Sequence, residues 1–222
     1  MIFGYSLVLI SLVISLIVQI NIKSTYSRYR DVRSDRNISG AEAARRILDA
    51  NGLYNVQIQQ IGGELTDHFD PRTNVVSLST DVFHGTSLAS VGVAAHEVGH
   101  AIQHAQGYAP IRIRSAIVPV TNIGSRLFYP VILLGMILGM PQLLDVGIIL
   151  FSLVVVFQFV TLPVEFNASS RALASLEQLG ILGSDELHGS RKVLSAAALT
   201  YVAALVTSLL QLIRLLALRN RR

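Results

Sequence analysis

The chain has 222 residues, of which 51% are hydrophobic and only 14% are charged, and its formal net charge is +4. A soluble domain carries roughly 25% charged residues, so the shortfall indicates a membrane protein with several spans rather than an ordinary soluble globule. There are no cysteines, so any metal must be held by His and carboxylate side chains. The positive charge lies beside the apolar runs, where it is typical of topology signals and lipid-headgroup contacts rather than of a nucleic-acid surface.

The first apolar run, from Ile2 to Ile20, contains no charged residue and is long enough to cross about 30 Å of hydrocarbon as a helix. A signal peptide is the competing interpretation, but no basic segment precedes the run, the run is too long, and no small-residue cleavage site follows. The residues that follow directly include Lys23, Arg28, Arg30, Arg33 and Arg36. By the positive-inside rule, this charge places the C-terminal side of a retained helix in the cytoplasm.

The middle of the chain is polar and is expected to form a small α+β domain. Ser39-Gly40-Ala41-Glu42 matches a capping box and predicts the start of a helix. Two strands are predicted at 56–61 and 74–79, because both runs are rich in β-branched residues and are bounded by turn residues. A second helix is predicted at 87–105.

Three further apolar segments follow. The first, 127–139, is short and has to extend towards the N-terminus to cross a membrane, whereas 143–162 is a clear span. The third, 193–218, precedes the basic tail Arg219-Asn220-Arg221-Arg222. Four spans would place this tail outside the cell, against the positive-inside rule. Either the last segment does not fully cross, or the tail is an exception.

The links between these segments carry different charges. The link 140–145 has no basic residue, whereas the link before the last segment contains Arg171, Arg191 and Lys192. The positive-inside rule therefore places the first link, which contains the polar domain, inside the cell, the second outside and the third inside.

One motif points to chemistry. His96 and His100 lie at positions i and i+4 of a predicted helix, so both imidazoles project from one face, about 6 Å apart along the axis. From that separation two ring nitrogens can reach one zinc ion at about 2.1 Å each. Glu97 follows the first histidine and is placed to act on metal-bound water rather than to bind the metal. A helix with two surface histidines is the alternative interpretation.

A catalytic zinc site needs a third protein ligand and an open position for water. His104 continues the i+4 series, but about 12 Å along the axis separate it from His96, so the two cannot belong to one tetrahedron. Glu165 is the better candidate, because it emerges at the cytoplasmic end of the third span, on the same side of the membrane as the two histidines. Ser169 lies one turn further on and is expected to hydrogen-bond a metal ligand.

The remaining histidines show no ligand spacing. His68, His84 and His188 are expected at the surface or in loops. Asp67, His68 and Asp70 are candidates for a separate metal cluster, but the Asp-Pro pair at 70–71 explains them more simply as turn chemistry.

Several stretches resemble the YugP-type membrane zinc metallopeptidases, and the resemblance covers most of the chain. They are TDHFDPR (66–72), GVAAHEVGHAIQ (92–103), LPVEFNAS (162–169) and RKVLSAAALTY (191–201). The resemblance implies zinc endopeptidase activity without naming a substrate. More distantly, the chain is similar to the HtpX heat-shock and CAAX prenyl protease families. In those families a downstream Glu, here Glu165, is a metal ligand, and an Asp follows it where this chain has Ser169.

We therefore expect a mainly α membrane protein with about four transmembrane helices and a small α+β zincin-like catalytic domain. Its expected parts are an anchor helix at 1–22, the catalytic domain at 23–115, and membrane helices at 116–222 that supply the third ligand. We expect the protein in the cell membrane, with its active site facing the cytoplasm.

The expected activity is zinc-dependent endopeptidase cleavage of membrane or membrane-proximal proteins, with Zn²⁺ as cofactor and Glu97 as general base. The strand at 75–79 is a candidate to offer a free edge to an extended substrate, and a buried edge is equally compatible with the sequence. The expected partners are protein or peptide substrates and the lipid bilayer, with no nucleic acid; other membrane proteins or further copies of the chain stay open.

Two alternatives remain. A site-2-type intramembrane protease is suggested by Pro141–Gly147, although Asp145 in that stretch should lie on the opposite side of the bilayer from His96. The other alternative is a non-catalytic quality-control scaffold that retains a metal site.

Overall fold

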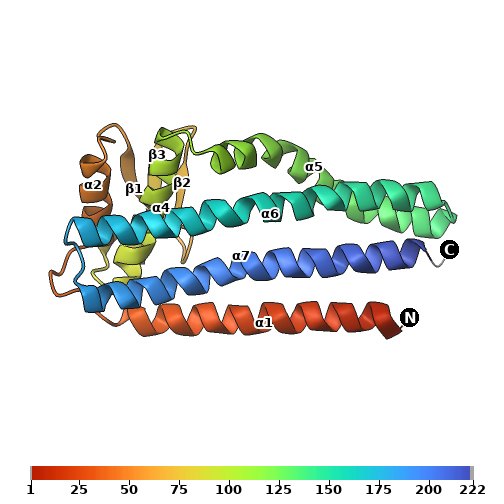
Figure 1. The fold of residues 1–222 in the computed structure, drawn as a ribbon, viewed down its shortest axis with the longest axis horizontal. Helices are drawn as coiled ribbons and strands as arrows, with labels where there is room; N and C mark the ends of the chain where they lie inside the picture. The colour runs from red at the N-terminus through yellow and green to blue at the C-terminus, as the bar shows by residue number, and fades with distance from the viewer. Residues whose placement is uncertain (1, 221–222) are drawn as a thin grey trace. The chain divides into compact units, whose positions relative to one another are not determined.

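The computed structural model describes residues 2–220, with side chains from residue 5 onward. Within that range the chain is mainly helical, with seven helices and one three-stranded sheet (Figure 1). The elements are α1 (Ile2–Arg30), α2 (Gly40–Ala50), β1 (Gln57–Ile61), β2 (His68–Asp70), β3 (Val75–Ser79), α3 (Thr80–His84), α4 (Leu88–Ala105), α5 (Ala109–Leu138), α6 (Pro141–Gln178) and α7 (Ser184–Arg219). They form two compact units: unit 1 comprises Met1–Gln19, Arg112–Pro163 and Leu199–Arg222, and unit 2 comprises Ile20–Ile111 and Val164–Ala198.

The sheet lies in unit 2 and has the strand order β1-β3-β2. β1 pairs with β3 in parallel, and β2 pairs with β3 antiparallel. The two predicted strands are confirmed as β1 and β3, whereas β2 was not predicted. Of the two alternatives left open for the strand at 75–79, the structure shows the buried edge: β3 is paired on both sides, and the outer edges of the sheet belong to β1 and β2.

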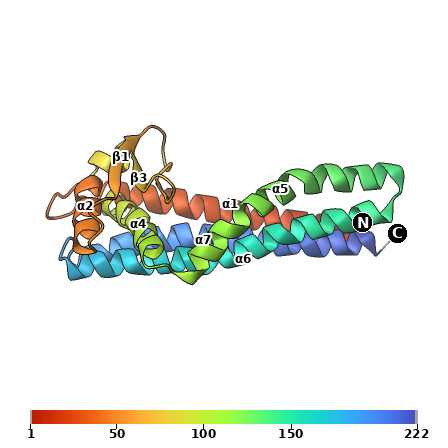
Figure 2. The ribbon, with the colours of Figure 1, turned by 90° about the horizontal axis from the view of Figure 1, so that it is seen from above.

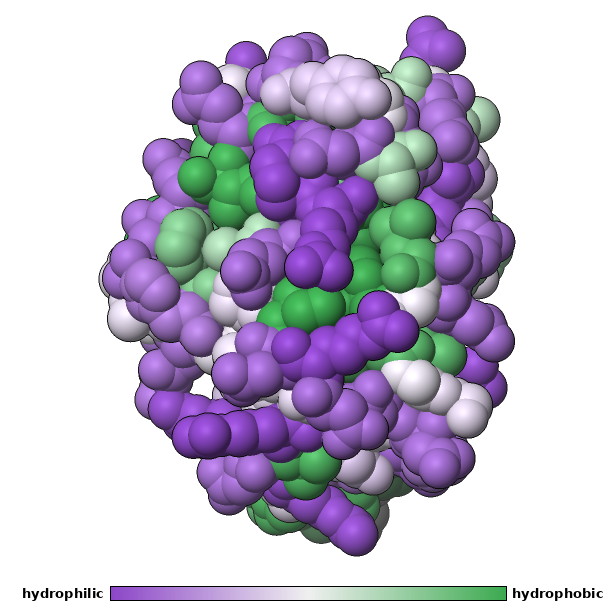
Figure 3. All heavy atoms as spheres, turned by 90° about the vertical axis from the view of Figure 1, so that its left-hand side faces the viewer, coloured by the Kyte–Doolittle hydropathy of each residue, from purple (hydrophilic) through white to green (hydrophobic). Residues whose placement is uncertain are grey.

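The predicted capping box begins α2, as expected. The Ser39 hydroxyl accepts a hydrogen bond from the Glu42 amide, and the Glu42 carboxylate accepts one from the Ser39 amide at 2.9 Å. The apolar side of α2 is fully buried and packs on α4; it consists of Ala43, Ala44, Ile47 and Leu48. The end of unit 2 that Figure 3 faces is predominantly hydrophilic, as expected for a water-exposed domain around a small apolar core.

Helix α4 confirms the helix predicted at 87–105. Ser87 caps its N-terminus by accepting from the Ser90 amide, and most of its side chains are buried. In unit 2 it packs closely against α6: a Cβ added at Gly99 would lie 2.6 Å from the backbone oxygen of Ala168. This contact between two backbones requires glycine, and it holds the two helices in one register.

Four described helices are long and apolar enough to cross a membrane: α1, α5, α6 and α7. The expected fold class is therefore confirmed. α6 continues through Pro163 for 38 residues instead of ending near residue 162, so Glu165 lies within a helix and not beyond its end. α5 extends from 127–139 towards the N-terminus, as expected for a span. It is bent (Figure 2), and the internal prolines Pro119 and Pro130 are a cause of bending.

Unit 1 contains an ion pair between the start of α6 and the end of α7. Arg219 Nε donates to Asp145 Oδ1 at 2.9 Å. α7 is unbroken and is long and apolar enough to cross a membrane. Arg221 and Arg222, in the basic tail, lie outside the described residues.

Candidate metal centre

Helix α4 brings two imidazoles together in unit 2. His96 and His100 are one turn apart on the same face, and their ring centroids are 4.8 Å apart in an edge-to-face arrangement. Their side chains are 15% and 11% exposed, so both are largely buried and still reach solvent. This placement follows from the local i, i+4 geometry of a helix.

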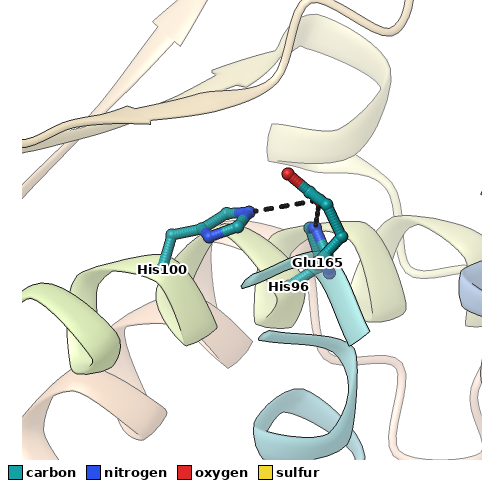
Figure 4. A group of neighbouring side chains, drawn as sticks. All are labelled: His96, His100 and Glu165. Carbon is teal, nitrogen blue, oxygen red and sulfur yellow. Dashed lines mark hydrogen bonds and ion pairs between the residues drawn. The ribbon is translucent and has the colours of Figure 1, made fainter. Parts of the chain in front are cut away.

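Helix α6 points Glu165 between the two rings (Figure 4). Its side chain is only 2% exposed, and Oε2 lies 3.3 Å from His96 Nε2 and 3.6 Å from His100 Nε2. Ligands bound to one tetrahedral zinc at about 2.1 Å are separated from each other by about 3.4 Å. The two distances from Glu165 are close to this value, and the three side chains offer one ligand atom each, all within 4.8 Å of one another, so the group is a candidate zinc site.

The other ring nitrogen of each histidine, Nδ1, also has a hydrogen-bond partner. Ser169 Oγ lies 3.1 Å from His96 Nδ1, and Gln103 Oε1 lies 3.0 Å from His100 Nδ1. An amide oxygen can only accept, so His100 carries its proton on Nδ1 and keeps the lone pair of Nε2 for a metal. The sequence indicated Ser169 as such a contact but missed Gln103.

The electrostatic field at the site favours a cation. Burial of His100 lowers its pKa, but the hydrogen bond to Glu165 and the charges of Glu97 and Glu165 outweigh this effect and raise the pKa above its ordinary value. A site that stabilises positive charge on an imidazole is also suited to a divalent cation.

Glu97 is buried, with 8% exposure, and it is not a member of the three-residue ligand group. It lies close enough for its charge to raise the pKa of His100. This position is compatible with proton transfer beside a metal rather than with ligation, and its role stays a prediction.

The remaining sequence candidates lie elsewhere. His104 is exposed and its ring contacts Phe69 of β2, with centroids 6.0 Å apart. His68 and His84 are exposed and hydrogen-bond Thr66 and Gln60. None of these three histidines belongs to the ligand group.

The two acidic residues of the proposed 67–70 cluster have structural partners. Asp67 accepts from the amide and hydroxyl of Ser79, and Asp70 accepts from the amide of Arg72. The turn interpretation is therefore confirmed for Asp70. Asp145, from the site-2-type alternative, pairs with Arg219 and is also outside the ligand group.

Comparisons with known proteins agree with this geometry. A family model described as "Putative neutral zinc metallopeptidase" matches residues 4–220. The chain is 50% identical over 196 residues to the "Putative membrane protease YugP" of Bacillus subtilis (strain 168), which covers 88% of this chain and 87% of that protein. No solved structure matches the chain.

Proposed function

The chain belongs to this neutral zinc metallopeptidase family, and from that premise we propose that it is a membrane-embedded zinc metalloendopeptidase. The observation that carries the proposal is the convergence of His96, His100 and Glu165, whose ligand atoms lie within 4.8 Å of one another, with Glu165 at 3.3 and 3.6 Å from the two imidazoles. Three protein ligands leave the fourth position for water, which is the arrangement of a catalytic rather than a structural zinc.

Each residue has a distinct part in the proposed mechanism. His96, His100 and Glu165 hold the ion, and Ser169 orients His96. When bound, zinc lowers the pKa of a coordinated water towards about 7 and polarises the scissile carbonyl. Glu97 takes the proton of the attacking water and delivers it to the leaving amine.

We place the substrate along the outer edge of β2. β2 is an edge strand of the sheet, packs against α4 and contacts His104 through Phe69. An extended peptide can pair with a free strand edge through its main chain, which suits an endopeptidase that acts on unfolded or loop segments. This assignment replaces the edge of β3, which is closed on both sides.

The proposed setting is the cell membrane, with the active site facing the cytoplasm. In this arrangement 1–22 anchors the chain, 23–115 forms the catalytic domain, and 116–222 forms membrane helices that supply Glu165. The substrates would be membrane or membrane-proximal proteins, and the lipid bilayer is the other partner. Four helices of spanning length and the basic residues after the first span support this proposal.

The test replaces Glu97 with Gln, which keeps the shape of the side chain and removes the base. We expect the purified variant to retain about one zinc per chain and to lose peptidase activity, while His96→Ala loses the zinc as well. Membrane proteins that accumulate in cells carrying Glu97→Gln, relative to wild type, identify substrates. Full activity in Glu97→Gln would remove this residue from the mechanism, and a zinc-loaded wild type that cleaves none of the accumulating proteins would favour the scaffold alternative.

A further inference from the structure

Gln103 is a buried amide whose surroundings lie on two different helices. It is one turn after His100 on the inner face of α4, and it is 0% exposed. A buried primary amide without hydrogen bonds costs several kcal/mol, so its partners decide whether the position is stable. All of its partners lie in unit 2.

The oxygen and the nitrogen of the Gln103 amide have different hydrogen-bond partners. Oε1 lies 3.0 Å from His100 Nδ1. Nε2 donates to the backbone oxygen of Val164 at 2.8 Å and to Asn167 Oδ1 at 3.0 Å. The amide group therefore links the imidazole of one candidate ligand to the helical turn that carries the other, because Val164 directly precedes Glu165.

The orientation of this amide is fixed by its neighbours. A backbone carbonyl can only accept, so the NH₂ group must face Val164. Asn167 Oδ1 imposes the same choice, because it also accepts from Arg171 Nε at 2.7 Å and is thereby held as an oxygen at that position. The oxygen of Gln103 is then the atom that faces His100, and it can bond only to a protonated Nδ1.

We propose that Gln103 is a positioning residue of the metal centre, which fixes the tautomer of His100 and the register of Glu165 with a single side chain. The proposal rests on the proposed function, because it takes His100 and Glu165 as zinc ligands. If the amide were reversed, His100 would have to accept at Nδ1 and would present an N–H to the ion. Gln103 therefore keeps the correct lone pair directed at the site before the ion arrives.

The first test compares Gln103→Met with Gln103→Glu. Methionine has a side chain of similar length to glutamine but no strong hydrogen-bonding group. We therefore expect zinc affinity, measured by competition with a chelator, to fall about 10- to 100-fold. Glutamate restores an oxygen opposite His100 Nδ1 but loses the donor to Val164 and Asn167, so we expect it to recover only part of that loss. In cobalt-substituted protein, we expect Met to change the visible absorption bands and Glu to restore them.

Gln106→Met is the matched control. Gln106 is exposed at the end of the same helix and accepts from Arg171, so its loss should leave zinc affinity within about twofold. An unchanged affinity and cobalt spectrum in Gln103→Met would overturn the proposal. Equal losses in Met and Glu variants that are both folded would also overturn the proposed control of the His100 tautomer, because the restored oxygen opposite Nδ1 would then have no effect.

A measurement on the wild type covers the case in which the variants do not fold. Nitrogen-15 NMR of labelled histidines in the zinc-loaded protein reports which ring nitrogen of His100 is protonated. We expect a protonated Nδ1 and a metal-bound Nε2; binding through Nδ1 would overturn the proposal. A wild type that takes up no zinc would instead contradict the proposed function, and the two failures are thereby distinguished.

Discussion

Glu165 is the residue of the candidate site whose environment most strongly favours a neighbouring positive charge. Its carboxylate is 2% exposed and faces two imidazoles. Burying an ionised carboxylate costs several kcal/mol unless a positive charge compensates it. A divalent cation held by the same three side chains supplies that compensation without requiring either histidine to become protonated, as an ion pair would.

The resulting prediction concerns zinc content. Glu165→Ala should lose most of its zinc on dialysis against a chelator, because two imidazoles alone cannot hold the ion. His104→Ala should keep about one zinc per chain, since His104 is exposed and contacts Phe69 instead. Both are measured as zinc per folded chain after equal dialysis. An empty His104→Ala beside a loaded Glu165→Ala would refute the ligand assignment.

The three side chains of the candidate ligand group could be predicted from the sequence, for two different reasons. His96 and His100 follow from spacing on one helix, which is local information. Glu165 was predicted from membrane topology, which concerns the whole chain but follows from a simple charge rule. Gln103 could not be predicted, because a glutamine near a helix end has no distinguishing pattern, and its burial depends on how α6 packs.

At the scale of elements, the site depends on how closely α4 approaches α6. Gly99 lies between the two histidines, and its missing side chain lets the two backbones touch at Ala168. The glycine within the His-Glu-x-x-His segment is therefore a packing requirement as well as part of a motif.

We predict that Gly99→Ala separates the two helices. The new Cβ would lie 2.6 Å from the Ala168 oxygen, which is backbone and cannot move away freely. Zinc affinity should fall at least tenfold, and the free energy of unfolding should fall by about 1–3 kcal/mol. Gly62→Ala is the control, because nothing lies within 4 Å of its added Cβ. Zinc retention equal to that of the control would contradict the close contact.

A second prediction at this scale concerns the start of α2. Ser39→Ala removes the cap and should lower the free energy of unfolding by about 1 kcal/mol. Hydrogen bonds from the Ser39 amide and hydroxyl lower the pKa of Glu42. The part of the stability that depends on Glu42 is thus fully present above its unfolded pKa of about 4.3 and is lost as the pH falls through the lowered folded value. Chemical unfolding of wild type and Ser39→Ala across pH 3–7 tests this, and a difference that grows in acid would contradict it.

The sheet was only partly predictable. β1 and β3 have β-branched residues and clear boundaries, whereas β2 has three residues and runs directly into a proline turn. Which strand lies in the middle is set by pairing between distant segments, and a single sequence does not encode that in any local pattern. The continuation of α6 through Pro163 has the same origin: a proline removes one helical hydrogen bond, but packing on both sides can sustain the helix.

At the scale of the whole molecule, the charge distribution predicts how the chain is oriented in the membrane. On the proposed topology, the basic residues after the first span and near the start of α7 would lie on the cytoplasmic side of the membrane. Arg219, which would lie on the other side, is paired with Asp145. This pairing offsets part of the positive charge of the tail and helps to explain why the chain departs there from the positive-inside rule.

The prediction for topology uses the absence of cysteine from the chain. Single replacements Arg33→Cys, Gln142→Cys and Ser184→Cys fall on exposed positions. In intact cells an impermeant maleimide should label only Gln142→Cys, and permeabilised cells should label all three. Labelling that places positions 33 and 184 on different sides would break the link between His96 and Glu165.

The division of the ligand set between α4 and α6 also has a consequence for biosynthesis. The ribosome completes both histidines and Glu97 well before it reaches Glu165, and α5 and most of α6 lie between them. On the proposed ligand set, a nascent chain therefore cannot retain zinc, and cannot cleave its neighbours, until its third long helix has been made and inserted. On the proposed function, the order of residues along the chain would thus delay peptidase activity until the enzyme is seated in its membrane.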